Sequence, residues 1–307
     1  MFGGYGKTIL FGEHFVVHGL PGVVAALNVQ TSARVLSYPA PDYKLIDSRP
    51  RFVLPVAAKA VGYQLLFENI ARELGVIKPI HMELFGTLPV CSGGIGSSAA
   101  AAVALVHALN KYFALSLTHE QIAHAALAGE RAVHGNPSGI DSTAALNGGV
   151  IIFQRGSAGN VITPLQLKKN LPFVLIDTGF SSDTKRVVEQ VARVRAEQPA
   201  LFNKLCADYQ QLFKRACNAL READYATLGI CMNANHLLLQ ELGVSSPELE
   251  QLTELARCMG ALGAKLTGTG RGGLVLVLAV DVAMQQLLVK SYTQVGYKAF
   301  GVELTGL

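Results

Sequence analysis

The chain has 307 residues, of which 50% are hydrophobic and 16% are charged, and its formal net charge is +4. This length accommodates two domains with their own cores, and the composition is that of a compact protein rather than a disordered one. The mild positive charge suits an anionic small-molecule substrate. The sequence lacks the basic blocks of nucleic-acid binders, so we expect no nucleic-acid partner.

Cysteine usage and hydropathy indicate the cellular environment. The five cysteines form neither a CxxC pair nor a zinc spacing, and no secretory leader is evident. We therefore expect reduced thiols in a cytoplasmic protein. The longest apolar run, residues 99–109, is interrupted by His107 and is well short of the roughly 20 residues of a membrane span. We expect no association with a membrane.

The first half of the chain starts with apolar runs that are typical of strands and continues with helical periodicity. The polar, proline-bounded stretch 47–55 is predicted to be a mobile loop. We expect strands at 8–11, 22–27, 33–38, 80–85 and 149–153, and helices at 57–74, 97–113 and 119–134.

A Gly-, Ser- and Asn-rich stretch at 155–161 predicts a domain boundary, which divides the chain into residues 1–160 and 161–307. Strands that bracket helices predict a split β-α-β sheet in the second domain. Here we expect strands at 172–177, 263–267, 273–280 and 297–304, and helices near 183–197, 199–221, 223–242, 247–260 and 281–293.

The segment Pro89–Ala100 is the most informative part of the sequence. It reads PVCSGGIGSSAA, so glycines lead directly into two serines and an alanine-rich helix. Glycine lets backbone N–H groups converge on an anion, and the helix N-terminus adds a partial positive charge. We therefore expect residues Gly93, Gly94, Ile95, Gly96, Ser97 and Ser98 to hold nucleotide phosphates.

Two common nucleotide motifs fit less well. The mononucleotide P-loop would need glycine at position 1 before Gly6-Lys7-Thr8, where Met1 stands. Gly94-x-Gly96-x-x-Ala99 fits a relaxed dinucleotide fingerprint, but Glu120, the nearest acidic candidate, lies at a helix start rather than after a second strand. A dinucleotide site therefore stays the weaker alternative.

Two carboxylates flank a Pro/Gly turn in the segment GERAVHGNPSGID. Glu130 lies near the end of a helix and Asp141 just past the turn, so the two could converge. Phosphoryl transfer uses one carboxylate for Mg²⁺ and another to accept or orient a hydroxyl proton. The alternative is a helix-capping aspartate and a surface glutamate.

Two further segments carry candidate residues. Lys7 begins an apolar strand that ends in Glu13-His14, and such groups are costly to bury unless paired or used; a flanking lysine and a core pair are the alternatives. The loop at Gly268, Gly270 and Arg271 leads into a strand rather than a helix. It is either a hairpin turn or a loop that packs on the first glycine loop or contacts phosphates.

Together these motifs resemble those of the galactokinase, homoserine kinase, mevalonate kinase and phosphomevalonate kinase superfamily, most closely its mevalonate kinase branch. The resemblance rests on GKTILFGEH, on GERAVHGNPSGID and on Asn235-His236 before Leu242-Gly243-Val244, and it spans nearly the whole chain. It implies a two-domain α+β fold with an N-terminal domain of the ribosomal-protein-S5 type and a ferredoxin-like C-terminal domain. ATP and substrate would bind in the cleft between them.

The resemblance also implies an activity, namely ATP- and Mg²⁺-dependent phosphorylation of the 5-hydroxyl of (R)-mevalonate in isoprenoid synthesis. Asp141 would be the catalytic base and Lys7 its partner. Ser98 and Glu130 would coordinate Mg²⁺, and Glu13, His14 and Thr184 would lie near the substrate. Dimers are common in that family, so a homodimer is a candidate assembly.

The sequence departs from the family pattern twice. The glycine loop carries one extra residue before its glycines, which leaves its entry path open. Arg271 stands where glycine is common, and it either reaches ATP phosphates or the substrate carboxylate, or points to solvent. A sibling kinase acting on phosphomevalonate, homoserine or a sugar is the nearest alternative function. A non-catalytic metabolite sensor is the alternative from another class.

Overall fold

The computed structural model describes residues 3–52, 57–135, 137, 139–156 and 159–304. Contacts divide the chain into two compact units. Unit 1 contains residues 1–7, 26–90 and 95–148, and unit 2 contains residues 8–25, 91–94 and 149–307. This grouping follows contacts rather than chain order, and our division at residue 160 stays a prediction. Within the described residues, no helix is long and apolar enough to cross a membrane.

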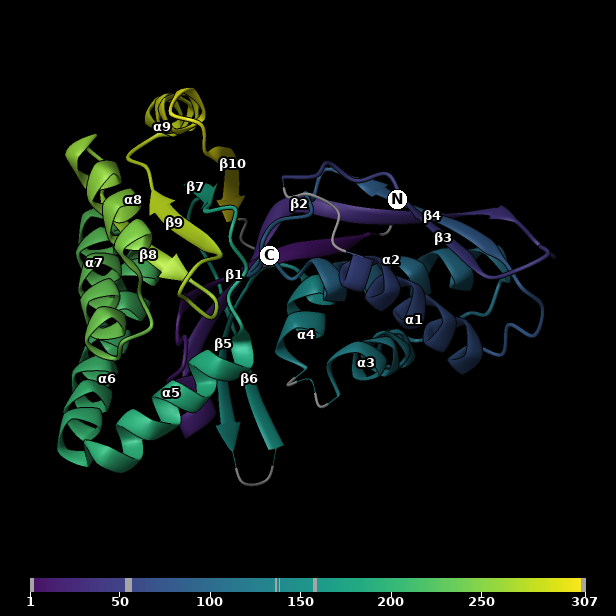
Figure 1. The fold of residues 1–307 in the computed structure, drawn as a ribbon, viewed down its shortest axis with the longest axis horizontal. Helices are drawn as coiled ribbons and strands as arrows, with labels where there is room; N and C mark the ends of the chain where they lie inside the picture. The colour runs from purple at the N-terminus through teal and green to yellow at the C-terminus, as the bar shows by residue number, and fades with distance from the viewer. Residues whose placement is uncertain (1–2, 53–56, 136, 138, 157–158, 305–307) are drawn as a thin grey trace. The chain divides into compact units, whose positions relative to one another are not determined.

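Unit 1 is a small sheet covered by helices on one face (Figure 1). Strand β4 (His81–Gly86) pairs in parallel with β3 (Lys44–Asp47) and antiparallel with β2 (Gly22–Ser37). The helices are α1 (Ala57–Glu73), α2 (Ser97–Tyr112), α3 (His119–His134) and α4 (Ile140–Asn147). The core lies between the sheet and these helices, with α1, α2 and α3 packed on one another.

The sequence explains why α2 and α3 form where they do. Residues 99–106 of α2 are all buried, because small alanine side chains let the helix pack closely against its neighbours. Thr118 starts α3 with a capping box in which its side chain and that of Gln121 each bond the other's backbone N–H. Close packing therefore holds α2 along its length, and the capping box fixes the N-terminus of α3.

Unit 2 is built around the antiparallel strand order β10-β7-β9-β8. These strands are β7 (Leu171–Asp177), β8 (Gly263–Thr267), β9 (Leu274–Leu278) and β10 (Lys298–Leu304). Strands β5 (Val150–Gly156) and β6 (Gly159–Leu165) form a hairpin beside the start of β2. The helices are α5 (Thr184–Glu197), α6 (Pro199–Glu222), α7 (Tyr225–Glu241), α8 (Pro247–Cys258) and α9 (Val282–Gln294).

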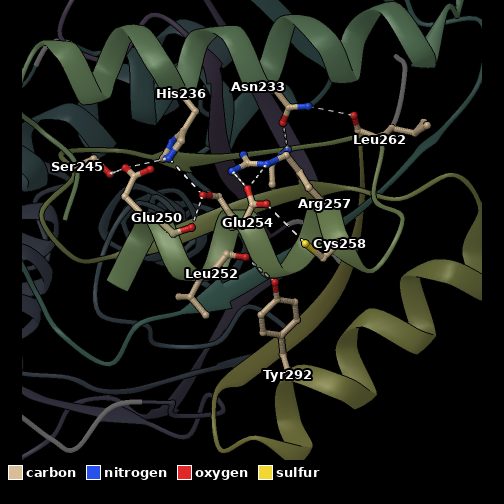
Figure 2. A network of polar contacts seen from close by, with 12 residues as sticks. Asn233, His236, Ser245, Glu250, Leu252, Glu254, Arg257, Cys258, Leu262 and Tyr292 are labelled. Atoms are coloured by element: carbon tan, nitrogen blue, oxygen red, sulfur yellow. Dashed lines mark hydrogen bonds and ion pairs between the residues drawn. The ribbon is translucent and has the colours of Figure 1, made fainter. Parts of the chain in front are cut away.

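A polar network joins α7, α8 and β8 inside unit 2 (Figure 2). His236 is 1% exposed, and its Nδ1 accepts a hydrogen bond from the Leu266 N–H at 3.2 Å. Its Nε2 therefore carries the hydrogen and faces Glu250 Oε1 at 3.2 Å and Thr253 Oγ1 at 3.3 Å. Burial lowers the pKa of His236, against the opposing effect of Glu250. The network holds β8 in place. This strand leads into the loop at Gly268, Gly270 and Arg271, which is called the third glycine-rich loop below.

Most sequence-based elements are confirmed within one to three residues, and the differences lie in short elements. The runs at 22–27 and 33–38 belong to one 16-residue strand, β2, because the polar residues between them stay in the ladder. Strand β1 (Gly4–Phe11) starts before its apolar run, and β3, β6, α4 and the 3-10 turn η1 (Val16–His18) were not predicted. The stretch 155–161 includes the ends of the β5–β6 hairpin.

Over its described part, the predicted loop at 47–55 has no regular structure after β3, but it is anchored, and its mobility stays a prediction. Arg49 is buried, and it donates two hydrogen bonds to the Asp47 carboxylate at 2.9 Å and one to Thr31 Oγ1 at 3.2 Å. Its guanidinium also lies 4.8 Å from the Tyr63 ring centre. A polar sequence thus forms an anchored turn because its charges are paired; residues 53–55 lie outside the described residues.

Candidate active site

The strongest chemical feature of unit 1 is an ion pair between Lys7 and Asp141. Strand β1 carries Lys7, whose side chain is 5% exposed, and the first turn of α4 carries Asp141, whose side chain is 45% exposed. Lys7 Nζ lies 3.0 Å from Asp141 Oδ1. A buried ammonium group therefore holds a carboxylate that solvent or a ligand can approach.

Glycines let β1 approach α2 closely beside this pair. A Cβ at Gly96 would lie 2.7 Å from Lys7 Cγ, and one at Gly4 would lie 2.2 Å from the Ala100 carbonyl oxygen. The Lys7 N–H also donates to the Ile95 carbonyl at 3.0 Å. The Lys7 side chain thus lies directly on the glycine loop, and a side chain at either glycine would separate the two elements.

The start of α2 is suited to bind an anion. Gly96 caps the helix with φ +68°, and no side chain caps the first-turn amides. Helix geometry leaves these N–H groups without intrahelical partners, and the helix dipole adds positive potential. The phosphate role of residues 93–98 stays a prediction.

Arg49 supports this turn, although sequence reasoning did not identify it. Its Nη1 donates to the Ser97 carbonyl at 3.3 Å, and Ser97 Oγ donates to the Pro89 carbonyl at 3.3 Å. Both contacts fix the first turn of α2 from outside. The signal in the sequence was one of two arginines in a polar stretch, where exposed arginines are far more common.

Glu130 is a buried carboxylate beside the same helix start. It is 3% exposed, and burial and the nearby charge of Asp141 raise its pKa to about 7, against the smaller effects of the Ser142 hydrogen bond and Lys7. Its Oε2 is buried and has no hydrogen-bond partner among the residues that the structure describes. One helical turn later, His134 Nε2 lies 3.3 Å from Ser98 Oγ. Residues four apart share a helix face, so Ser98 lies along the face that carries Glu130.

These groups fit a magnesium ion. A buried carboxylate oxygen without a partner is costly unless a cation completes it, and Mg²⁺ prefers oxygen ligands, using one or two carboxylates together with phosphates and water. Among the described residues, no group of three or more His, Cys, Asp and Glu side chains could hold a metal by itself. The arrangement suits a metal that arrives with a nucleotide rather than a permanent protein-held centre.

Glu13 and His14 lie in unit 2 and are both engaged by the chain. Glu13 forms a fully buried ion pair with Lys265 of β8, whose ammonium also donates to the Leu266 carbonyl at 2.8 Å. His14 has a left-handed backbone with φ +64°, and its Nε2 donates to the Thr269 carbonyl at 2.8 Å. Burial lowers the pKa of His14, which favours the neutral ring. Sequence reasoning missed Lys265, because a lysine in a short strand gives no sign of its burial.

The third glycine-rich loop organises the same region. Thr269 Oγ1 lies 3.3 Å from Thr184 Oγ1 at the start of α5, so this loop contacts both His14 and Thr184. A Cβ at Gly268 would lie 3.3 Å from Gly94 Cα, which confirms that the loop packs on the first glycine loop. A Cβ at Gly270 would lie 2.1 Å from the Val244 carbonyl oxygen.

Arg271 is exposed, but it also donates hydrogen bonds to two carbonyl groups of the protein. Its backbone N–H donates to the Val244 carbonyl at 2.8 Å, and its Nε donates to the Gly243 carbonyl at 3.1 Å. The Gly273 N–H donates to the Phe180 carbonyl at 2.8 Å. These amides are used within the fold, so this loop differs from the amide-rich start of α2.

The entry to the first glycine loop is anchored by Asp177, a residue that sequence reasoning also missed. Asp177 ends β7, and its carboxylate accepts hydrogen bonds from Ser92 N at 2.9 Å and from Ser92 Oγ at 2.5 Å. A Cβ at Gly93 would meet nothing within 4 Å, so this glycine is not required by packing. The extra residue before the glycines is thus accommodated by a serine held on a strand end.

Comparisons with known proteins agree with this architecture. The family models for the N-terminal and C-terminal domains of GHMP kinases match residues 59–149 and 218–288. Mevalonate kinase from Thermococcus sibiricus is 33% identical over 90% of this chain and 87% of its own length. Mevalonate kinase from Pyrococcus furiosus is 32% identical over 89% of this chain and 87% of its own length.

A solved structure is similar over almost the whole fold. The crystal structure of L. major mevalonate kinase in complex with R-mevalonate has a TM-score of 0.91 and 35% sequence identity, covering 99% of this chain and 95% of that one. The expected two-domain kinase fold is therefore confirmed. By its sequence and its fold, the chain belongs to the GHMP kinase family, within the group of the mevalonate kinases.

Proposed function

We propose that this chain transfers the γ-phosphoryl group of ATP to the 5-hydroxyl of (R)-mevalonate, giving 5-phosphomevalonate and ADP. The observation that supports it most is the Lys7–Asp141 pair, which lies against the glycine loop at the start of α2. A base, a cation and an anion-binding helix start are what a phosphoryl transfer to an alcohol needs. The mevalonate kinase relatives support the choice of alcohol.

Asp141 acts in this proposal as the base. Its partly exposed carboxylate accepts or orients the proton of the 5-hydroxyl while the hydroxyl oxygen attacks the γ-phosphorus and the bond to the ADP oxygen breaks. Lys7 holds the carboxylate in place and contributes positive charge where negative charge gathers on the transferred group. The first-turn amides of α2 bind the phosphates that do not react.

Glu130 and Ser98 are the proposed magnesium ligands. Mg²⁺ would neutralise phosphate charge there, and the buried Oε2 of Glu130 would gain the partner that the fold does not provide. His134 Nε2 lies 3.3 Å from Ser98 Oγ and can accept a hydrogen bond from the Ser98 hydroxyl. The oxygen lone pairs of Ser98 then point away from His134 and are free to bind the metal.

His14 and Thr184 are the proposed substrate contacts in unit 2. Because His14 Nε2 donates to Thr269, the neutral ring keeps Nδ1 as a hydrogen-bond acceptor for a substrate hydroxyl. Glu13 is paired with Lys265, so we propose that it supports the neighbouring His14 rather than contacting the substrate directly. A cytoplasmic location and a homodimer remain proposals from the sequence.

The test is ADP release by the purified protein with Mg·ATP, offered mevalonate, phosphomevalonate, homoserine or galactose. We expect turnover with mevalonate alone and a phosphate on the 5-oxygen, which phosphorus NMR identifies. Turnover with another of these alcohols would move the substrate assignment while keeping the chemistry. Silence with all four, with ATP still bound, would favour a sensor over a kinase.

A further inference from the structure

The third glycine-rich loop contains one residue whose side chain leaves the loop to bind another element. Arg271 is exposed and has a left-handed backbone with φ +52°, although glycine is the residue that adopts this conformation without cost. Its neighbours Gly270, Gly272 and Gly273 also have positive φ. A glycine would therefore suit the backbone at 271 better, and the arginine must offset this strain through its side chain.

The side chain provides a second attachment to the end of α7. The backbone bond from Arg271 N–H to the Val244 carbonyl is available to any residue except proline, but only a long donor side chain reaches the Gly243 carbonyl as well. Gly243 lies two residues after the last residue of α7, in the turn that leads to α8. Gln190 Nε2 donates to the same carbonyl at 3.2 Å, so Gly243 is a fixed anchor rather than a loose end.

The loop that is anchored in this way carries Thr269, two residues earlier. The Thr269 carbonyl holds His14 at 2.8 Å, and its hydroxyl lies 3.3 Å from the Thr184 hydroxyl. Both partners are the substrate contacts proposed above, and His14 itself has a strained backbone. Movement of the loop would therefore displace both contacts together.

We infer that Arg271 is a positioning residue for mevalonate recognition: it ties the third loop to the C-terminal end of α7 and thereby presets His14 and Thr184. This role rests on the proposed function. It differs from a direct contact with ATP phosphates or with the substrate carboxylate in resting on the Nε bond to Gly243 rather than on the Nη groups. A positioning role predicts weaker mevalonate binding with little change in the chemical step.

The primary test is Arg271→Gly, which removes the side-chain bond and relieves the backbone strain, so folding should be preserved. Loss of one charged hydrogen bond to a carbonyl predicts a KM for mevalonate raised by about three- to ten-fold, with kcat and the KM for ATP within about two-fold of wild type. Calorimetric titration with mevalonate should show the same fold-change in Kd. Arg271→Lys keeps one donor of similar reach and should recover part of the loss.

Two controls separate this inference from its alternatives. Arg257→Ala removes a partly exposed arginine of α8 that pairs with Glu254, and it should leave both KM values unchanged. A direct ion pair with the substrate would make KM less dependent on salt once Arg271 is removed, whereas a positioning role leaves that dependence as in wild type. Wild type without mevalonate turnover would refute the proposed function instead.

Three results would overturn the positioning role. The first is an Arg271→Gly enzyme with wild-type KM and Kd for mevalonate while wild type is active. The second is a rise confined to the KM for ATP. The third is a fall in kcat that is as large as the rise in KM and that Arg271→Lys does not relieve.

Discussion

Each unit contains one acidic centre, and the two differ in whether a carboxylate remains accessible to a ligand. In unit 1, Glu130 has a buried oxygen without a partner and a pKa raised to about 7, and Asp141 remains partly exposed beside Lys7. In unit 2, Glu13 is paired with the buried Lys265, which donates to a carbonyl as well. The first centre has the features of one that a ligand completes. The second is an ion pair with both side chains fully buried, and it maintains geometry.

Asp141→Asn, in the acidic centre of unit 1, should have the largest effect on turnover. The amide keeps the shape of the carboxylate but cannot accept the hydroxyl proton, so kcat should fall by about 10²- to 10⁴-fold. Coupled ADP release measures kcat, and binding of a fluorescent ATP analogue checks that the nucleotide site persists. Near-native turnover would show that Asp141 is not the base.

Lys265→Met tests the buried ion pair of unit 2. Methionine fills a similar volume but leaves the Glu13 carboxylate buried without its cation, which should lower the free energy of unfolding by about 3–5 kcal/mol. Urea denaturation near neutral pH measures this. The double variant Glu13→Gln, Lys265→Met removes both charges and should regain most of the loss. An unchanged urea midpoint for the single variant would mean that the pair contributes nothing to stability.

Glu130→Gln should have a smaller effect that depends on pH. The folded-state pKa of about 7 lies above the ordinary value of 4.5, so the wild type loses stability as pH rises through this interval. Glutamine avoids that loss, so the variant should match wild type near pH 4.5 and exceed it by about 3 kcal/mol above pH 8.

Thermal melts at the two pH values measure the difference that Glu130 makes. Millimolar Mg²⁺ with ATP should raise the melting temperature of wild type more than that of Glu130→Gln, since the metal stabilises the ionised carboxylate. Matching melting temperatures of the two proteins at both pH values would contradict the buried, costly carboxylate.

The residues that sequence reasoning identified are those whose chemistry is visible locally. The glycine loop, the Glu130 to Asp141 segment and the long amphipathic helices all have patterns within a few positions, and most element boundaries followed from them. Arg49, Asp177 and Lys265 could not be found in this way. Their importance comes from partners 48, 85 and 252 residues away in sequence, which only the fold brings close.

Short elements were missed for a related reason. Strand β3 and helix α4 have only four and eight residues, so neither offers enough periods for a pattern to emerge. The anchoring of the 47–52 turn was missed because its polar composition suits an exposed loop, while its charges are in fact paired inside the protein. Ion pairing overrode composition there.

The glycine contacts between β1 and α2 also limit how this enzyme can be redesigned. Gly4 lies against Ala100 and Gly96 against Lys7 with no room for a single methyl group, so neither position can carry a side chain. A library that aims at new alcohol substrates should therefore leave these positions fixed and place its diversity around Thr184. The third loop sets a similar limit at Gly270, where a Cβ would lie 2.1 Å from the Val244 carbonyl oxygen.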